Sequence, residues 1–490
     1  MMAINSFSRM GPENPVLVGA VLAALALLVP FSYDIMLALY AWAVLAVSIL
    51  LLRRVYGPAI LLMALVIQFA QASAILVQGA ILGLPIVQLP EQGPWIEHTE
   101  FFALTAMLCL AIGMRLGSGT VLKRPAAMAA IDMEISPEAA LRFYLLTYAA
   151  AGIFAILGKF GGAATFQLVL NLGGVRWVGL FVLFYASLRP GGRPLYAVIV
   201  LAVDVGIGLT GFFASFKETF YVAFLAILVS GARITAMRIF ALTAMMTILF
   251  TLMGFWSAIK TDYRQFLNRG SGAQVVTQEL GDRIDYIVKQ VENVDGRMMQ
   301  YGFTRLLDRV SYVYYLGRTM QTVPALLPHE DGALLGAAVM HILTPRLLFP
   351  EKAALPSDSV VTAKYANMGT YYVRMAGSTS ISIGYLGELY VDFGEAGALM
   401  ACVILGLLYG RIHRSLCDYR RLPAYLNYGV SVMVLLNAVQ FEQALIKTIG
   451  SVIASLIIAL LLRRYVLPWI FVFATEIDTM VRDQFQRAKG

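Results

Sequence analysis

Long apolar runs dominate the chain, separated by short stretches rich in Arg, Lys, Gly and Pro. A helix needs about 20 mostly apolar residues to cross a hydrocarbon layer of about 30 Å, and several runs have this length. The pattern predicts about twelve membrane helices, near residues 15–31, 34–52, 58–82, 99–117, 142–159, 175–188, 194–212, 215–231, 239–258, 385–410, 424–445 and 448–463. The sixth is short, and residues 160–174 would form its interfacial or re-entrant beginning.

Composition supports this interpretation. Of the 490 residues, 59% are hydrophobic and 13% charged, with a mean hydropathy of +0.75. Soluble domains carry about 25% charged residues, so a soluble protein is excluded. We expect an all-α, polytopic integral membrane helix bundle. The first apolar segment lacks a basic leader and a cleavage site, which predicts a retained helix. Cys109, Cys402 and Cys417 lack the spacing of a zinc site or a disulfide framework.

Basic residues define an orientation. Positive charges mark cytoplasmic loops, so the side that carries them is expected to be the cytoplasm, with both termini there. These residues are Arg53, Arg54, Arg115, Lys123, Arg124, Arg142, Arg189, Arg193, Arg233, Arg238, Arg411, Arg414, Arg420, Arg421, Arg463 and Arg464. The net charge of +8 is thus interpreted as a topology signal and not as a nucleic-acid site.

A polar segment interrupts the apolar pattern between residues 259 and 384. Its basic and acidic residues are nearly balanced and its apolar residues keep helical spacing, so we expect a large, mainly helical periplasmic loop. The predicted division is 1–258 for an N-terminal membrane bundle, 259–384 for the loop, 385–465 for C-terminal membrane helices and 466–490 for a cytoplasmic tail.

The sequence lacks Walker, dinucleotide-binding, HExxH and GxSxG motifs, so chemistry driven by ATP or NAD is not expected. Cations on the outer side remain. Arg305 and Arg309 share a helix face and would grip a phosphate from two directions, unless Asp308 and other acids neutralise them on a solvated helix. Lys217 opens the eighth helix, beside Glu218, at the same membrane side.

Two further stretches carry candidate residues. "HILTPRLLFPEKAALPSD" offers His341, Arg346 and Lys352 from a proline-stiffened path, either to an anionic lipid headgroup or to ordinary phospholipid. "GYLGELYVDFGEAG" places Glu388 and Asp392 on one helix face, where desolvation would favour proton uptake by a general base. The alternative for both acids is helix capping.

Asp204 lies within the seventh predicted helix. A membrane-buried acid usually faces a partner or a wet cavity, and we expect a structural ion pair with Arg176 or Lys217.

Together these stretches resemble the Wzy-type O-antigen, or oligosaccharide repeat-unit, polymerases. The resemblance covers roughly residues 211–410 and rests on three features in order: Phe216-Lys217-Glu218, a large outer loop that ends in "TPRLLFPEK", and "GYLGELYVDFGEAGALMACVILGLL". Many relatives carry Arg-x10-Gly repeats in two outer loops. Here nine residues, and not ten, separate Arg374 from Gly384. Lys217 occupies the position where relatives often have arginine.

The resemblance implies transfer of a growing glycan from undecaprenyl pyrophosphate to an incoming lipid-linked oligosaccharide unit. Pyrophosphate or donor contacts would come from Lys217, Arg305, Arg309, Arg346, Lys352 and Arg374, with Glu388 as the first candidate for the base and His341 behind it. No cofactor or metal is implied. Membrane lipids, a chain-length regulator and a flippase are the further expected partners. A glycan ligase and a lipid-linked oligosaccharide flippase are the alternatives.

Overall fold

The structure is a computed structural model. It describes residues 14–55, 57–119, 135–160, 171–212, 215–231, 233, 235–271, 275–344, 349, 351–352, 356–369, 380–419 and 421–476. Within these ranges every secondary-structure element of three or more residues is a helix, which confirms the expected all-α class.

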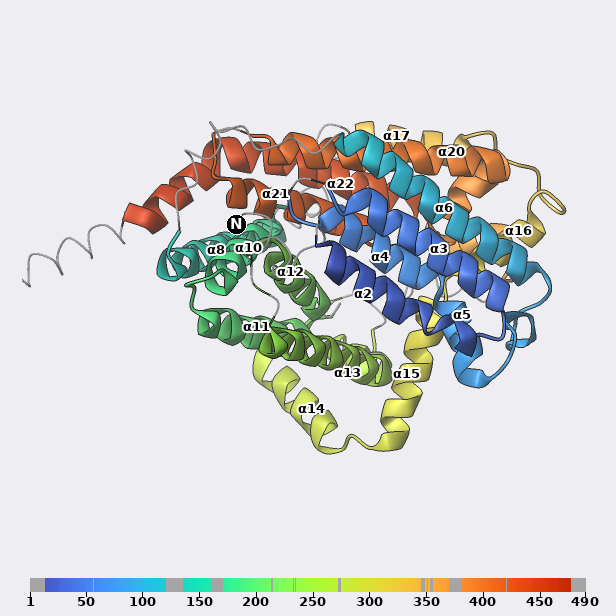
Figure 1. Ribbon diagram of the computed structural model, residues 1–490, viewed down its shortest axis with the longest axis horizontal. Coiled ribbons are helices and arrows are strands. Elements are labelled where there is room, and N and C mark those ends of the chain that lie inside the picture. The colour runs from blue at the N-terminus through green and yellow to red at the C-terminus, as the bar shows by residue number, and fades with distance from the viewer. Residues whose placement is uncertain are drawn as a thin grey trace, which may run out of the picture.

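The first part of the chain forms a series of packed helices (Figure 1). Their bounds are α2 Pro15–Ala26, α3 Ile35–Leu52, α4 Ile60–Ala72, α5 Ala74–Leu82, α6 Trp95–Ser118, α8 Pro137–Phe160, α10 Val175–Leu188, α11 Pro194–Leu209, α12 Phe216–Val229 and α13 Ala236–Leu267. After the polar segment follow α20 Gly384–Cys417, α21 Ala424–Leu435 and α22 Leu445–Leu461, which continues through a wider turn to Glu476.

Seven helices within the described ranges are long and apolar enough to cross a membrane, and eight if α4 and α5, bent by 44°, form one span. The chain is therefore a candidate membrane protein with many spans. Each of the twelve expected segments carries a helix, but α12, with 14 residues, and the stretches that contain α2, α11 and α21 are shorter than a full span. The count of twelve crossings stays a prediction.

The polar segment is helical wherever the structure describes it. It contains α14 Leu280–Glu292, α15 Gly296–Val310, α16 Val313–Thr322, α17 Ala333–Leu343 and α18 Asp358–Tyr365. The expected boundary at residue 258 falls inside α13, whose helix continues to Leu267. Below α13 in Figure 1 the chain runs through α14 to a turn and returns through α15, which packs on α13. The short helix α17 is apolar and packs on α20 and α22, a feature that the sequence analysis did not anticipate.

The helices α6 and α20 lie side by side (Figure 1) and meet along a seam of glycines. Gly113 and Gly117 on α6 face the backbone of α20, and Gly406 and Gly410 on α20 face the backbone of α6. A Cβ on any of the four would come within 2.1 to 2.3 Å of a carbonyl oxygen across the seam. Small residues four apart allow such close contact, which is a main source of helix association in membranes.

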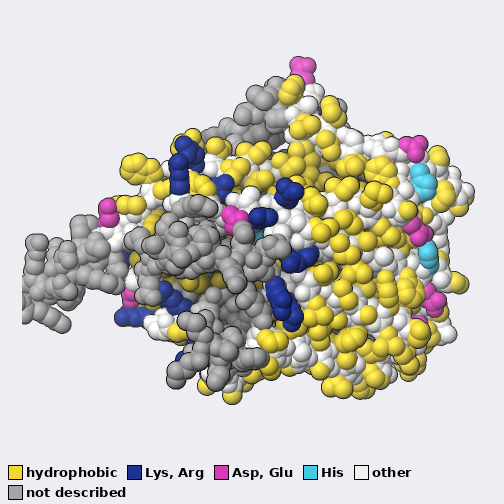
Figure 2. Space-filling view, turned by 45° about the horizontal axis from the view of Figure 1, so that its top comes forward, with side chains coloured by type: hydrophobic (Ala, Val, Ile, Leu, Met, Phe, Trp, Pro, Cys, Tyr) yellow, Lys and Arg dark blue, Asp and Glu magenta, His cyan; other side chains and the backbone are white. Residues whose placement is uncertain are grey.

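The charges on the surface are separated along the long axis. Figure 2 shows the Lys and Arg side chains of this face toward one end, with a few acidic ones among them, and His and further acidic side chains at the other end, across a broad apolar surface. This arrangement is typical of a membrane protein, because the apolar band matches lipid tails and the charged ends face water.

Candidate functional site

Four cations gather where α12, α13 and α15 meet. Lys217 lies in the first turn of α12, Lys260 and Arg264 lie one turn apart on α13, and Arg309 is in the last turn of α15. The charged neighbours that act on Lys260 are Arg309, Arg264 and Lys217, all of them positive. We call these four residues the cation cluster.

Helix packing brings the cluster together. At Gly302 a Cβ would lie 2.2 Å from the carbonyl oxygen of Gly254, so α15 crosses α13 in backbone contact. The end of α15 is also attached to α5, because Gln78 donates to the Asp308 carboxylate at 3.2 Å and accepts from Ser311 at 3.3 Å. Asp308 therefore contacts α5, whereas the sequence analysis offered it as the partner of the arginines.

The described ion pairs leave three of the four cations of the cluster without a carboxylate partner. Arg264 donates from Nε to the carbonyl oxygen of Phe212 at 3.2 Å, and its guanidinium lies 4.7 Å above that ring. Within the part of the chain that the structure describes, none of the ion pairs joins Lys217, Lys260 or Arg309 to a carboxylate. Repulsion between like charges is strong at partly buried positions, so this arrangement favours a bound anion.

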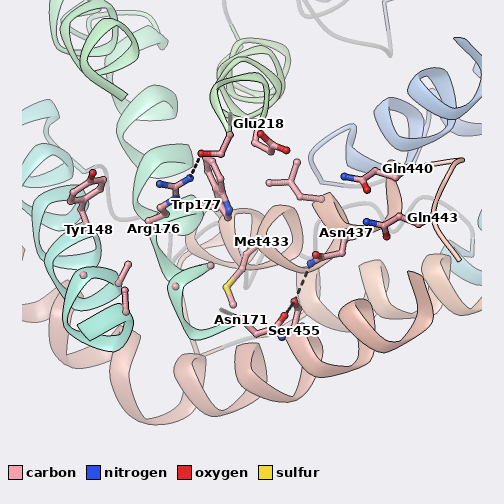
Figure 3. Close-up of a pocket in the computed structure, with 17 residues that line it drawn as sticks. Tyr148, Asn171, Arg176, Trp177, Glu218, Met433, Asn437, Gln440, Gln443 and Ser455 are labelled. Carbon is pink, nitrogen blue, oxygen red and sulfur yellow. Dashed lines mark hydrogen bonds between the residues drawn. The ribbon is translucent and has the colours of Figure 1, made fainter. Parts of the chain in front are cut away.

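A cavity of about 510 Å³ opens at the start of α12 (Figure 3). It is lined from α8, from the residues before α10 and its first turn, from the start of α12, and from α21, α22 and the chain between them. The polar and aromatic residues of this lining are Tyr148, Asn171, Arg176, Trp177, Ser215, Glu218, Asn437, Gln440, Gln443 and Ser455. Its volume lies within the range of about 300–1,000 Å³ that is usual for small-molecule sites.

The cavity and the cation cluster share the first turn of α12. Lys217 belongs to the cluster and Glu218 lines the cavity, because successive helical residues point about 100° apart. One carboxylate oxygen of Glu218, Oε2, is buried and finds no hydrogen-bond partner in the described part of the chain. Arg176 donates to the Ser215 hydroxyl at 3.4 Å, and its guanidinium lies 4.1 Å from the Trp177 ring. An anion site therefore adjoins a largely uncharged pocket.

Amide side chains organise the opposite wall of the cavity. The Ser455 hydroxyl donates to Asn171 Oδ1 at 2.7 Å and accepts from Asn437 Nδ2 at 3.0 Å (Figure 3). The Oε1 atom of Gln443 is buried and has no hydrogen-bond partner within the described ranges. This wall therefore combines fixed polar groups with an unsatisfied acceptor.

Glu388 and Asp392 share a face of α20, as expected, and each meets the start of another helix. Glu388 is buried and accepts from the Leu445 amide at 2.8 Å at the first residue of α22. Asp392 accepts from the amides of Leu334 and Leu335 at 3.0 and 2.7 Å, in the first turn of α17. Both acids therefore cap the starts of neighbouring helices, α22 and α17, in line with the capping alternative. Glu388 does not line the cavity.

The other predicted residues are dispersed. The Lys352 ammonium donates to the carbonyl oxygens of His341 and Thr344, the latter at 2.8 Å, at the end of α17. Arg305 is exposed, and its Nε donates to the Tyr301 hydroxyl at 3.0 Å. Arg346 and Arg374 lie outside the described residues. Of the six predicted phosphate ligands, the structure therefore brings together Lys217 and Arg309.

Asp204 is buried on α11 and accepts a hydrogen bond from the Thr219 hydroxyl on α12. This contact differs from the expected ion pair with Arg176 or Lys217. Thr219 follows Lys217 by two residues, so its side chain points to a different side of α12.

Sequence reasoning missed Lys260 and Arg264, since both were counted as part of the loop. Their signal was present, because two cations at i and i+4 at the end of a long apolar helix share a face. It also missed the cavity, whose walls come from helices far apart in the chain. Comparison with protein-family models, curated proteins and solved structures finds no match for this chain.

Proposed function

We propose that this protein is a glycosyltransferase of the bacterial inner membrane that polymerises lipid-linked oligosaccharide repeat units. The growing glycan would move from undecaprenyl pyrophosphate to an incoming lipid-linked unit at the periplasmic face. The observation that carries the proposal is the cation cluster beside a polar cavity at the ends of apolar helices. One substrate then places its pyrophosphate on the cations and its sugars next to the cavity.

The charge of the leaving group supports this choice. In the transfer, negative charge develops on the pyrophosphate as the bond to the anomeric carbon breaks. Fixed cations at partly buried positions stabilise such charge without reorganisation, and the loss of one such donor typically costs about 10²–10³ in rate. Lys217, Lys260, Arg264 and Arg309 would act in this way.

Alanine substitution of Lys217 or Arg309 tests the proposal. Each variant replaces the wild type in the native strain, and surface polysaccharide length is measured at matched protein levels. We expect long chains to be lost. Arg297→Ala is the matched control, because Arg297 is an exposed cation on the same helix as Arg309, at its other end. Unchanged long chains in both cluster variants would refute the assignment.

Deletion of the gene separates the proposed reaction from its alternatives. A polymerase deletion should leave glycan of a single repeat unit attached to the final acceptor. Free lipid-linked long chains would instead indicate a ligase, which shares the donor and the leaving group. Accumulation of the lipid-linked unit on the cytoplasmic face would indicate a flippase.

A further inference from the structure

The lining of the cavity suits a sugar better than an anion. Its amides, contributed by Asn171, Asn437, Gln440 and Gln443, each combine hydrogen-bond donors with an acceptor, as the hydroxyls of a sugar require. Trp177 adds an aromatic surface on which the apolar face of a sugar ring can pack. The guanidinium of Arg176 lies against Trp177 and donates to Ser215, so it is already engaged.

Two acceptors in this lining need a donor. Among the residues that the structure describes, Glu218 Oε2 and Gln443 Oε1 are buried and have no hydrogen-bond partner. Leaving a buried acceptor unsatisfied costs free energy, and the cost is larger for a charged group. Donation from ligand hydroxyls would remove this cost at both atoms. The neighbouring chain of Asn171, Ser455 and Asn437 is already hydrogen-bonded, so that part of the wall is preorganised.

Glu218 lies at the junction of the two sites. It follows Lys217 directly, so a carboxylate in the cavity is one residue away from a cation of the cluster. In a transfer reaction the attacking hydroxyl must lose its proton next to the carbon that the pyrophosphate leaves. A carboxylate beside a pyrophosphate site has the position required for this task.

We infer that the cavity binds the terminal sugar of the acceptor unit and that Glu218 accepts the proton of its attacking hydroxyl, an inference that rests on the proposed function. The hydroxyl oxygen forms a bond to the anomeric carbon of the donor glycan as the bond from that carbon to pyrophosphate breaks. The bonding electron pair stays on the pyrophosphate oxygen, which the cation cluster stabilises. The hydroxyl proton moves to the Glu218 carboxylate.

Two measurements on the purified, full-length protein in lipid nanodiscs test the inference. The binding probe is the free oligosaccharide that mild acid releases from the lipid-linked units of the native strain. The transfer assay supplies the intact lipid-linked units and measures the polymer formed. We expect Trp177→Ala to raise the Kd of the free oligosaccharide about tenfold or more. Glu218→Gln keeps an acceptor oxygen but loses the charge, so it should raise that Kd by less than about tenfold and lower the transfer rate about 10²–10⁴-fold.

Controls separate this inference from the proposed function. Glu97→Gln changes an exposed acid on α6 outside the cavity and should alter neither readout. Glu218→Asp keeps the carboxylate and should recover part of the transfer rate. Lys217→Ala should abolish transfer and retain oligosaccharide binding, since the probe carries no pyrophosphate.

Specific results would overturn the inference. Full transfer activity in Glu218→Gln would exclude Glu218 as the proton acceptor. Unchanged oligosaccharide binding in folded Trp177→Ala, or no binding by the wild type, would exclude the cavity as the sugar site. If the wild type binds the oligosaccharide but forms no polymer from lipid-linked units, the proposed polymerase function fails and the sugar site stands.

Discussion

The glycine seam between α6 and α20 offers a direct test of what holds the bundle together. Replacing Gly113 by alanine would place a Cβ 2.1 Å from the carbonyl oxygen of Val403 and 2.9 Å from the Leu407 amide nitrogen, where ordinary contacts begin at 3.4 Å. Both neighbours are backbone atoms inside a helix, so neither can rotate away. The two helices would have to separate, and the contacts at the other seam glycines would loosen with them.

The expected cost follows from this geometry. Overpacking of a well-packed site typically costs about 1–3 kcal/mol, and a clash between two backbones belongs at the upper end of that range. We therefore expect Gly113→Ala to lower the free energy of unfolding by about 3 kcal/mol, roughly a hundredfold in the folding equilibrium. Close packing is a main driving force for helix association in a membrane, so polar interactions elsewhere would not compensate.

The assay compares the variant with a glycine that has room. At Gly206 on α11 an added Cβ would have no atom within 4 Å, so Gly206→Ala should be neutral or stabilising by up to about 1 kcal/mol through helix propensity. Thermal unfolding of both variants is measured in one detergent by loss of helical circular dichroism. Equal unfolding temperatures for the two variants would refute the reasoning.

Two further predictions concern Glu388 on α20 and Glu330 in the polar segment. Glu388→Ala should lower the free energy of unfolding by about 1 kcal/mol, because the Leu445 amide loses its acceptor. Glu388→Gln should retain both stability and transfer activity. If Glu388→Gln loses activity at unchanged stability, Glu388 is again the candidate for the base. Hydrogen bonds from the Tyr365 hydroxyl at 2.6 Å and the Lys364 ammonium at 2.9 Å lower the pKa of Glu330. This contribution to stability is present above the unfolded pKa of about 4.3 and is lost as the pH falls through the lower folded pKa. The unfolding temperature should therefore fall less between pH 6 and pH 3 in Tyr365→Phe than in the wild type. Equal falls in the two proteins would contradict the assignment.

The helices were predictable because apolar length is a local property. Each apolar run of the sequence carries a helix in the structure, since a backbone surrounded by lipid must satisfy its hydrogen bonds within the segment. Boundaries were less predictable. The helix α13 continues past residue 258 into polar sequence, because its last turns pack against the start of the α11–α12 connection. There the Tyr263 hydroxyl donates to the Thr210 carbonyl oxygen.

The candidate site was predictable only in part. Lys217 and Arg309 are cations at helix ends, which sequence position alone can suggest. Their proximity to Lys260 and Arg264 depends on how α15 crosses α13 at Gly302 and Gly254, and no local pattern specifies that contact. The same holds for the two acids on α20. Their shared face follows from their spacing, whereas their partners, the first turns of α22 and α17, follow from packing.

Hydrophobicity and charge act on each segment separately, so the amino-acid sequence alone specified the class of the protein, the helices and the charged ends of the bundle. Which charges meet depended on the packing of the helices. That packing placed Glu218 in a cavity and Lys217 in a cluster of cations, although the two are neighbours in the chain. The physical reason is that the side chains of successive helical residues diverge, so the helices packed around α12 select the environment of each one.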